Sequence, residues 1–156
     1  DQGVSICDDE AWYSITPQVM AEHIANRVKH SILNRTNDKR TVKVLDAFSC
    51  VGGNFIQFSK ICGFCVGTEI DKRKVESCVK NCEVYGVRIP DEDQILNTDF
   101  LKLEEDLQNR QFKFPKDSND QNFDAVFLDP LWGGTTYSHQ SSFPVSNLSP
   151  PLFETL

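Results

Sequence analysis

Residues 43–55 read Lys-Val-Leu-Asp-Ala-Phe-Ser-Cys-Val-Gly-Gly-Asn-Phe, an apolar run that ends in an acid and passes through a small-residue turn into a second apolar segment. This order is typical of a first parallel strand, its glycine-containing turn and the following helix in an open α/β sheet. Ligands of such sheets bind beyond the carboxyl ends of the strands. We therefore expect two further strand ends, at residues 66–71 and 125–132, to point at the same crevice.

The length and charge of the chain limit what it can be. Its 156 residues suit one domain with a buried core, and 25% charged with 39% hydrophobic residues is ordinary for a soluble protein. The net charge of −7 argues against a broad phosphate-binding surface but leaves room for a pocket that holds one nucleotide. No apolar run approaches the roughly 18 residues of a membrane span, and residues 1–10 are acidic, unlike a signal peptide. We expect no membrane partner.

Six cysteines raise the question of a metal site. Cys62 and Cys65 form a C-x-x-C pair, and Cys78 and Cys82 follow a short way downstream, which is compatible with zinc. Cys78 and Cys82 also fall on the apolar face of a predicted helix, where thiols behave as small apolar side chains. We favour this second interpretation and predict no metal, with reduced thiols in an intracellular compartment.

Hydrophobic periodicity and turn residues predict the remaining elements. Thr16 before Pro17 resembles an N-cap and first helical position, and the helix it opens runs to about residue 33. Its predicted apolar face carries Met20, Ile24, Val28 and Ile32. Downstream we predict strands at 42–48, 64–70, 94–98 and 123–128, helices at 54–62, 72–85 and shortly after 101, and mostly loop from 133 to 156. The chain thus divides into an N-terminal helical segment, residues 1–41, and an α/β sheet domain, residues 42–156.

The residues at the predicted strand ends indicate a nucleotide cofactor. Gly52 and Gly53 allow the backbone to approach a ligand closely, and Asn54 opens a helix whose amide groups can meet a carboxylate or phosphate. Glu69 lies 23 residues beyond Asp46 and ends the second predicted strand, where an acid accepts hydrogen bonds from ribose hydroxyls. The chain lacks the G-x-G-x-x-G of nicotinamide-binding proteins, so an adenosine-containing cofactor of another kind is indicated.

The fourth predicted strand ends in Asp129-Pro130-Leu131-Trp132. A carboxylate and turn carbonyls there can accept hydrogen bonds from an exocyclic amine while the aromatic ring stacks on the base. That arrangement suits transfer of a methyl group to a planar nitrogen. The alternative is that Asp-Pro merely ends the strand and Trp132 fills the core, and these residues taken alone leave both hypotheses open.

These segments together resemble the trimethylguanosine synthase family. Its members use S-adenosyl-L-methionine to methylate N2 of the 7-methylguanosine cap on small RNAs. The resemblance rests on residues 12–17 (Trp-Tyr-Ser-Ile-Thr-Pro), 21–25, 44–48, 51–58 (Val-Gly-Gly-Asn-Phe-Ile-Gln-Phe), 81–86, 98–100, 126–128, 130 and 132–134 (Trp-Gly-Gly). It implies a Rossmann-like class I methyltransferase sheet in residues 42–156.

The resemblance also implies roles for individual residues. The cofactor would be held by Thr16, Asp46, Gly52, Gly53, Asn54, Glu69, Asp99 and Phe100. Asp129, Pro130 and Trp132 would form the catalytic and guanine-binding site, with Trp132 stacked on the positively charged 7-methylguanine. The implied partners are capped small RNA and ribonucleoprotein proteins, with no metal. The implied location is the nucleus, with the cytoplasm as a further alternative.

Three features depart from the family pattern. Cys50 stands where the family usually has glycine, and Asp129-Pro130-Leu131 replaces the usual Ser-Pro-Pro. The family fold continues with three further strands after the fourth, so we expect this chain to be a fragment or a shortened paralogue. A weakly active paralogue that binds cofactor, cap or protein is therefore an alternative function, as is an N-methyltransferase for another RNA or DNA base.

Overall fold

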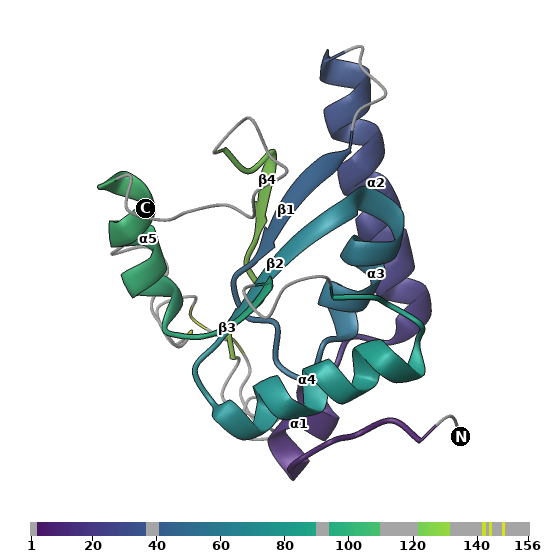
Figure 1. The fold of residues 1–156 in the computed structure, drawn as a ribbon, viewed down its shortest axis with the longest axis vertical. Helices are drawn as coiled ribbons and strands as arrows, with labels where there is room; N and C mark the ends of the chain where they lie inside the picture. The colour runs from purple at the N-terminus through teal and green to yellow at the C-terminus, as the bar shows by residue number, and fades with distance from the viewer. Residues whose placement is uncertain are drawn as a thin grey trace.

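A computed structural model describes residues 3–36, 41–89, 94–109 and 122–131, with residues 142, 144 and 148 (Figure 1). Four parallel strands form one sheet in the order β3-β2-β1-β4. They are β1 (Val42–Asp46), β2 (Gly63–Glu69), β3 (Ile95–Asn97) and β4 (Ala125–Phe127). This order and orientation confirm the predicted Rossmann-like α/β sheet, with β1 at its centre.

Within the described ranges, five helices accompany the strands: α1 (Asp9–Ser14), α2 (Gln18–Thr36), α3 (Gly53–Cys62), α4 (Lys72–Val84) and α5 (Phe100–Gln108). Helices α2 and α3 lie on one side of the sheet and α5 on the other (Figure 1). Successive side chains of β1 point to opposite faces, so Val42 and Val44 join the core under α2 and α3, while Leu45 joins a smaller core with Val66 and Leu103.

The predicted ends of the middle elements are confirmed. Asp71 accepts a hydrogen bond from the backbone N–H of Arg73 at 2.8 Å and caps α4. Gly63 ends α3 with a φ of 99°, in the left-handed region that favours glycine. Gly63 thus turns the chain from α3 into β2, and Asp71 starts α4 directly after the carboxyl end of β2.

The start of α2 differs from the prediction. The helix begins at Gln18, and the carbonyl of Pro17 accepts hydrogen bonds from the N–H groups of Met20 and Ala21 at 2.9 and 3.0 Å. Thr16 is therefore not the cap, because its hydroxyl accepts a hydrogen bond from the side chain of Asn54 instead.

The buried face of α2 is also partly different. Ile32 is buried, and Ile24 and Val28 pack against the core as predicted, but Met20 is 58% exposed. Ala21 and Ala25 are buried in its place. Small side chains at these positions let α2 approach α3 closely, which a strict four-residue period of large side chains does not anticipate.

The four cysteines considered as possible zinc ligands follow the apolar interpretation. Cys62, Cys65, Cys78 and Cys82 are at most 2% exposed and belong to the core. Among the described residues, no group of three or more His, Cys, Asp or Glu side chains is placed to hold a metal ion. No helix in this part of the chain is long and apolar enough to cross a membrane.

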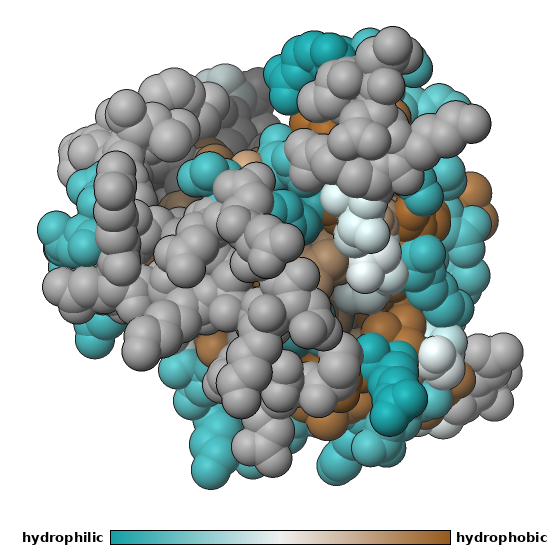
Figure 2. Space-filling view, turned by 45° about the horizontal axis from the view of Figure 1, so that its top comes forward, coloured by the Kyte–Doolittle hydropathy of each residue, from teal (hydrophilic) through white to brown (hydrophobic). Residues whose placement is uncertain are grey.

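On the face drawn in Figure 2, hydrophobic side chains reach the surface between hydrophilic ones.

Candidate functional site

A cavity of about 950 Å³ lies at the carboxyl ends of the strands. This volume is in the range of small-molecule sites. The ends of all four strands contribute to its wall, together with the chain between α1 and α2, which confirms the predicted common crevice. The predicted site residues on the wall are Thr16, Gly53, Asn54, Glu69, Asp99, Phe100, Asp129 and Pro130.

Two other predicted site residues, Gly52 and Asp46, are not among the residues that line the cavity. Gly52 has a φ of 95°, and a Cβ there would stand 2.8 Å from the Sγ of Cys78. A Cβ on neighbouring Gly53 would stand 3.0 Å from Cγ1 of Ile15. The chain's own backbone and packing thus account for both glycines. Asp46 is completely buried, and Trp132 falls outside the described residues.

Asp46 carries a buried carboxyl group without good hydrogen bonds. Neither oxygen has a partner of acceptable geometry within the described part of the chain. Burial raises the pKa of Asp46 to about 7, the backbone N–H of Phe48 opposes this shift only in part, and the carboxylates of Asp129 and Glu69 add to it. A cation or hydrogen-bond donor brought close to Asp46 would therefore relieve an unfavourable arrangement.

Glu69 has a carboxylate fixed by the backbone. Its Oε2 accepts the N–H of Cys50 at 3.1 Å and its Oε1 accepts the N–H of Asp71 at 2.8 Å. Each oxygen retains capacity for another donor, because a carboxylate offers about four acceptor positions. Glu69 can therefore receive two neighbouring hydroxyl groups without moving.

The third strand end contributes a cap and an aromatic wall. Oδ1 of Asp99 accepts the N–H of Leu101 at 3.1 Å, so Asp99 has a structural role at the start of α5 as well as a place on the cavity wall. The rings of Phe100 and Phe48 lie 5.8 Å apart at 55° and both line the cavity. Such a pair gives a planar heterocycle an apolar surface.

Three side chains from distant segments of the chain converge on the wall of the cavity. Asn54 Nδ2 donates to Thr16 Oγ1 at 2.9 Å and to Asp129 Oδ2 at 3.4 Å. The Thr16 hydroxyl donates to the same Asp129 oxygen at 3.5 Å. The sequence predicted each residue separately, but their mutual contacts span up to 113 positions and no local pattern indicates them.

Cys50 lies in the turn between Asp46 and the glycines and lines the cavity. Its φ of 47° makes it the only described non-glycine residue with a positive φ. Burial raises the pKa of its thiol to about 11, so the group is neutral at physiological pH. This left-handed position explains why glycine is the easier residue there.

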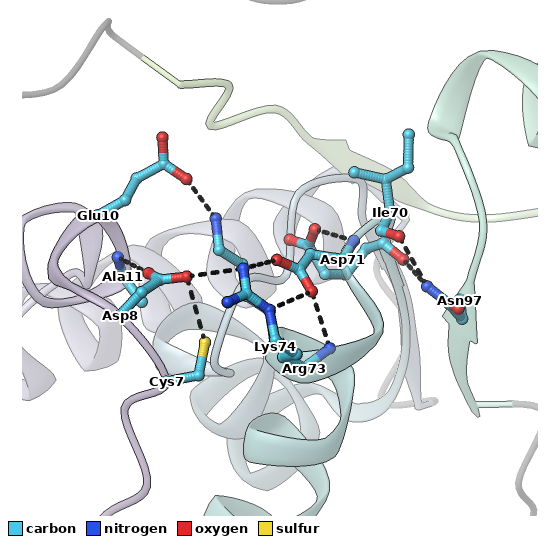
Figure 3. Close-up of polar contacts among 10 residues, drawn as sticks. Cys7, Asp8, Glu10, Ala11, Ile70, Asp71, Arg73, Lys74 and Asn97 are labelled. Carbon is cyan, nitrogen blue, oxygen red and sulfur yellow. Dashed lines mark hydrogen bonds and ion pairs between the residues drawn. The ribbon is translucent and has the colours of Figure 1, made fainter.

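Sequence reasoning missed the charged residues that join α1 to α4. Lys74 is 5% exposed, lines the cavity and pairs with Glu10, while Arg73 pairs with Asp71 at 2.6 Å and with Asp8 at 3.4 Å (Figure 3). Burial lowers the pKa of Lys74, but the hydrogen bond to Glu10 and nearby acidic groups outweigh it and the net shift is upward. Asp71 is close to Arg73 in the sequence, but Asp8 and Glu10 are more than 60 positions from their partners on α4, so no sequence spacing indicates these two pairs.

The chain is similar to proteins of known family over its whole length. The family described as RNA cap guanine-N2 methyltransferase matches residues 41–156. Trimethylguanosine synthase of Schizosaccharomyces pombe is 33% identical over 159 aligned residues, which cover 100% of this chain and 57% of that protein. Trimethylguanosine synthase of Saccharomyces cerevisiae is 28% identical over 92% of this chain and 40% of that protein. The chain thus spans about half the length of these relatives.

Among solved structures, the methyltransferase subunit of a type I restriction-modification system from Streptococcus thermophilus aligns with a TM-score of 0.47. The two sequences are 21% identical, and the alignment covers 73% of this chain and 22% of the Streptococcus thermophilus chain.

Proposed function

This chain belongs to the RNA cap guanine-N2 methyltransferase family, and from that membership we propose that the protein methylates N2 of a 7-methylguanosine cap on small RNA, using S-adenosyl-L-methionine. The observation that carries the proposal is the cavity at the strand ends. On one side Glu69 and the phenylalanine pair can hold an adenosine, and on the other Asp129 and Pro130 can hold an amine-bearing base.

The described residues fit the cofactor. Glu69 offers acceptors to the two ribose hydroxyls, and Phe48 and Phe100 offer an apolar surface to the adenine. The unpartnered carboxyl of Asp46 favours a positively charged group nearby. When bound, S-adenosyl-L-methionine would supply an electrophilic methyl group whose bonding electrons remain on sulfur as the methyl leaves.

The chain's own task is positioning. Asp129 would accept a hydrogen bond from the exocyclic amine and take up the proton that the nitrogen must lose as its new N–CH₃ bond forms. Pro130 is buried and fixes the turn that presents Asp129. Trp132 remains the proposed stacking partner of the cationic base.

Substitution of Glu69 tests the cofactor site. We expect Glu69→Ala to weaken S-adenosyl-L-methionine binding by about 1.5–3 kcal/mol, because charge-assisted bonds to the ribose are lost. Glu69→Gln should lose less, since one oxygen acceptor remains. Isothermal titration calorimetry measures both, and Glu83→Ala, an exposed position on α4, is the matched control.

Wild-type affinity in Glu69→Ala would remove Glu69 from the cofactor site. Transfer of labelled methyl groups tests the reaction itself, with 7-methylguanosine-capped RNA against the same RNA uncapped. Equal labelling of both RNAs would favour another RNA base as the substrate.

A further inference from the structure

We propose that Asn54 and Thr16 are positioning residues that orient the Asp129 carboxylate toward the exocyclic amine of the base. The inference rests on the proposed function and adds to it a device for recognising that amine. Neither residue needs to touch the base, because both act through Asp129.

The geometry of the contacts supports this role. Asn54 and Thr16 both donate to Oδ2 of Asp129, and Oδ1 receives no hydrogen bond from any described residue. The carboxylate is thus held by one oxygen while the other is left for a donor in the cavity that Asp129 lines. The two contacts are long, at 3.5 and 3.4 Å. Hydrogen bonds of this kind are often long in a free enzyme and tighten when the substrate binds.

The orientation of the Asn54 amide follows from its neighbours. An amide oxygen turned toward Asp129 would face a carboxylate, so the nitrogen must face it and the oxygen must point away. That oxygen, Oδ1, is buried and has no partner among the described residues. A buried acceptor without a donor is unfavourable for folding. Asn54 therefore serves Asp129 at the expense of stability.

Asn81 shows what a structural asparagine looks like in the same chain. It is 1% exposed, its Nδ2 donates to the carbonyls of Ser5 and Val51, and its Oδ1 accepts the N–H of Ser5 at 2.6 Å. Both ends of the Asn81 amide are used, whereas only the nitrogen of Asn54 is. The difference separates an amide that holds the fold from one that serves a neighbouring group.

The test compares two ligands that differ by one amine. 7-Methylguanosine and 7-methylinosine carry the same methylated ring system, but inosine lacks the exocyclic N2 group. In the presence of S-adenosylhomocysteine, we expect wild-type protein to bind the guanosine roughly ten- to a hundredfold more tightly, as fits one hydrogen bond to a charged acceptor. Asn54→Leu and Thr16→Val should bring this ratio down several-fold toward one, and Thr16→Ser should restore it.

Thermal unfolding provides the second measurement. Asn54→Leu should melt at or above the wild-type temperature, because a buried acceptor without a partner is removed. Asn81→Leu, the matched control, should melt clearly lower and keep the wild-type ligand ratio. An undiminished ratio in both Asn54→Leu and Thr16→Val would overturn the positioning role. A second combination of results would also overturn it. In that case Asn54→Leu loses as much melting temperature as Asn81→Leu, and Thr16→Val keeps the wild-type ratio of the two ligand affinities.

These outcomes also separate the inference from the proposed function. If the wild type binds both nucleosides equally or binds neither, recognition of the amine by Asp129 fails, and the positioning role fails with it. If the wild type discriminates and the variants discriminate equally, only the positioning role fails.

Discussion

Cys50 combines a strained backbone with a place on the wall of the cavity at the strand ends. A residue with a Cβ in the left-handed region is disfavoured by about 1–2 kcal/mol, while glycine there loses about 0.4–1 kcal/mol through the entropy of the unfolded chain. The thiol itself contributes no charge, since its pKa lies far above neutral pH. The strain is therefore the main feature that distinguishes cysteine from glycine at this turn.

We expect Cys50→Gly to be more stable than Cys50→Ala by about 0.5–1 kcal/mol, because both remove the thiol but only glycine relieves the positive φ. Urea denaturation of the two variants measures the difference. Cys50→Gly should also bind S-adenosyl-L-methionine more tightly, since the side chain that narrows the cavity wall is removed. If the alanine variant is at least as stable and the glycine variant binds no better, the turn has adapted to cysteine.

Asp46 makes stability depend on pH in an unusual direction. Its pKa is about 7 in the folded chain against an ordinary 3.8, so between these values the folded state holds a proton that the unfolded state has lost. The favourable contribution of this proton is complete below about pH 4 and is lost as the pH rises to about 7. Stability from this group should thus fall across that window and level off above it.

Asp46→Asn should remove most of this slope, because the amide is similar in shape and cannot ionise. Without cofactor, the variant should match the wild type near pH 4 and exceed it at pH 8 by something on the order of 2–4 kcal/mol. Denaturation curves recorded from pH 4 to 8 measure the difference. Parallel stability profiles for the two proteins would show that the carboxyl of Asp46 is satisfied in the folded state.

At the scale of single elements, local chemistry predicted most of the fold. The strands alternate with helices, and capping residues such as Asp71 and Gly63 mark boundaries within about one residue of where they lie. The order of the elements was enough to predict a parallel sheet with its ligand site at the carboxyl ends. The predictions that were wrong concern features that depend on contacts between elements.

Helix α1 and the face of α2 illustrate that limit. Helix α1 has only six residues, too few for an apolar period, and it is held by Asp8 as its cap and by ion pairs to α4. Met20 fits the period of α2 but is exposed, because packing against α3 favours the small side chains of Ala21 and Ala25. The spacing of apolar residues shows that a helix has an apolar side, but it does not determine how the helix is rotated about its axis against the helix it packs on.

The candidate site also combines residues that the sequence predicted with contacts that it did not predict. Residues at strand ends were predictable because topology alone brings them together, and eight of the predicted residues line one cavity. The pairing of Thr16 and Asn54 with Asp129, and of Lys74 with Glu10, required the folded chain. Asp46 was expected at the cofactor, but its complete burial could not be deduced from a strand that merely ends in an acid.

At the scale of the whole molecule, negative charge is concentrated where the proposed ligands are positive. The chain has a net charge of −7. Glu69, Asp99 and Asp129 line the cavity, and none of them forms an ion pair with a lysine or arginine in the described residues. The one described lysine on the wall, Lys74, is already paired with Glu10. The field in the cavity therefore favours cations.

This field should discriminate between the methyl donor and its product. S-adenosyl-L-methionine carries a sulfonium charge that S-adenosylhomocysteine lacks, so at low salt we expect the donor to bind roughly tenfold more tightly, a difference of about 1.4 kcal/mol. Asp99→Asn should narrow the preference without unfolding α5, because asparagine caps a helix as well as aspartate does. Added salt should reduce the preference for the donor less than Asp99→Asn does, since partly buried charges are weakly screened. Calorimetry with both ligands, with Glu83→Gln on the exposed surface of α4 as the control, measures the effect. Equal affinities for donor and product at low salt would mean that the cavity carboxylates are neutralised, and the charge argument would be wrong.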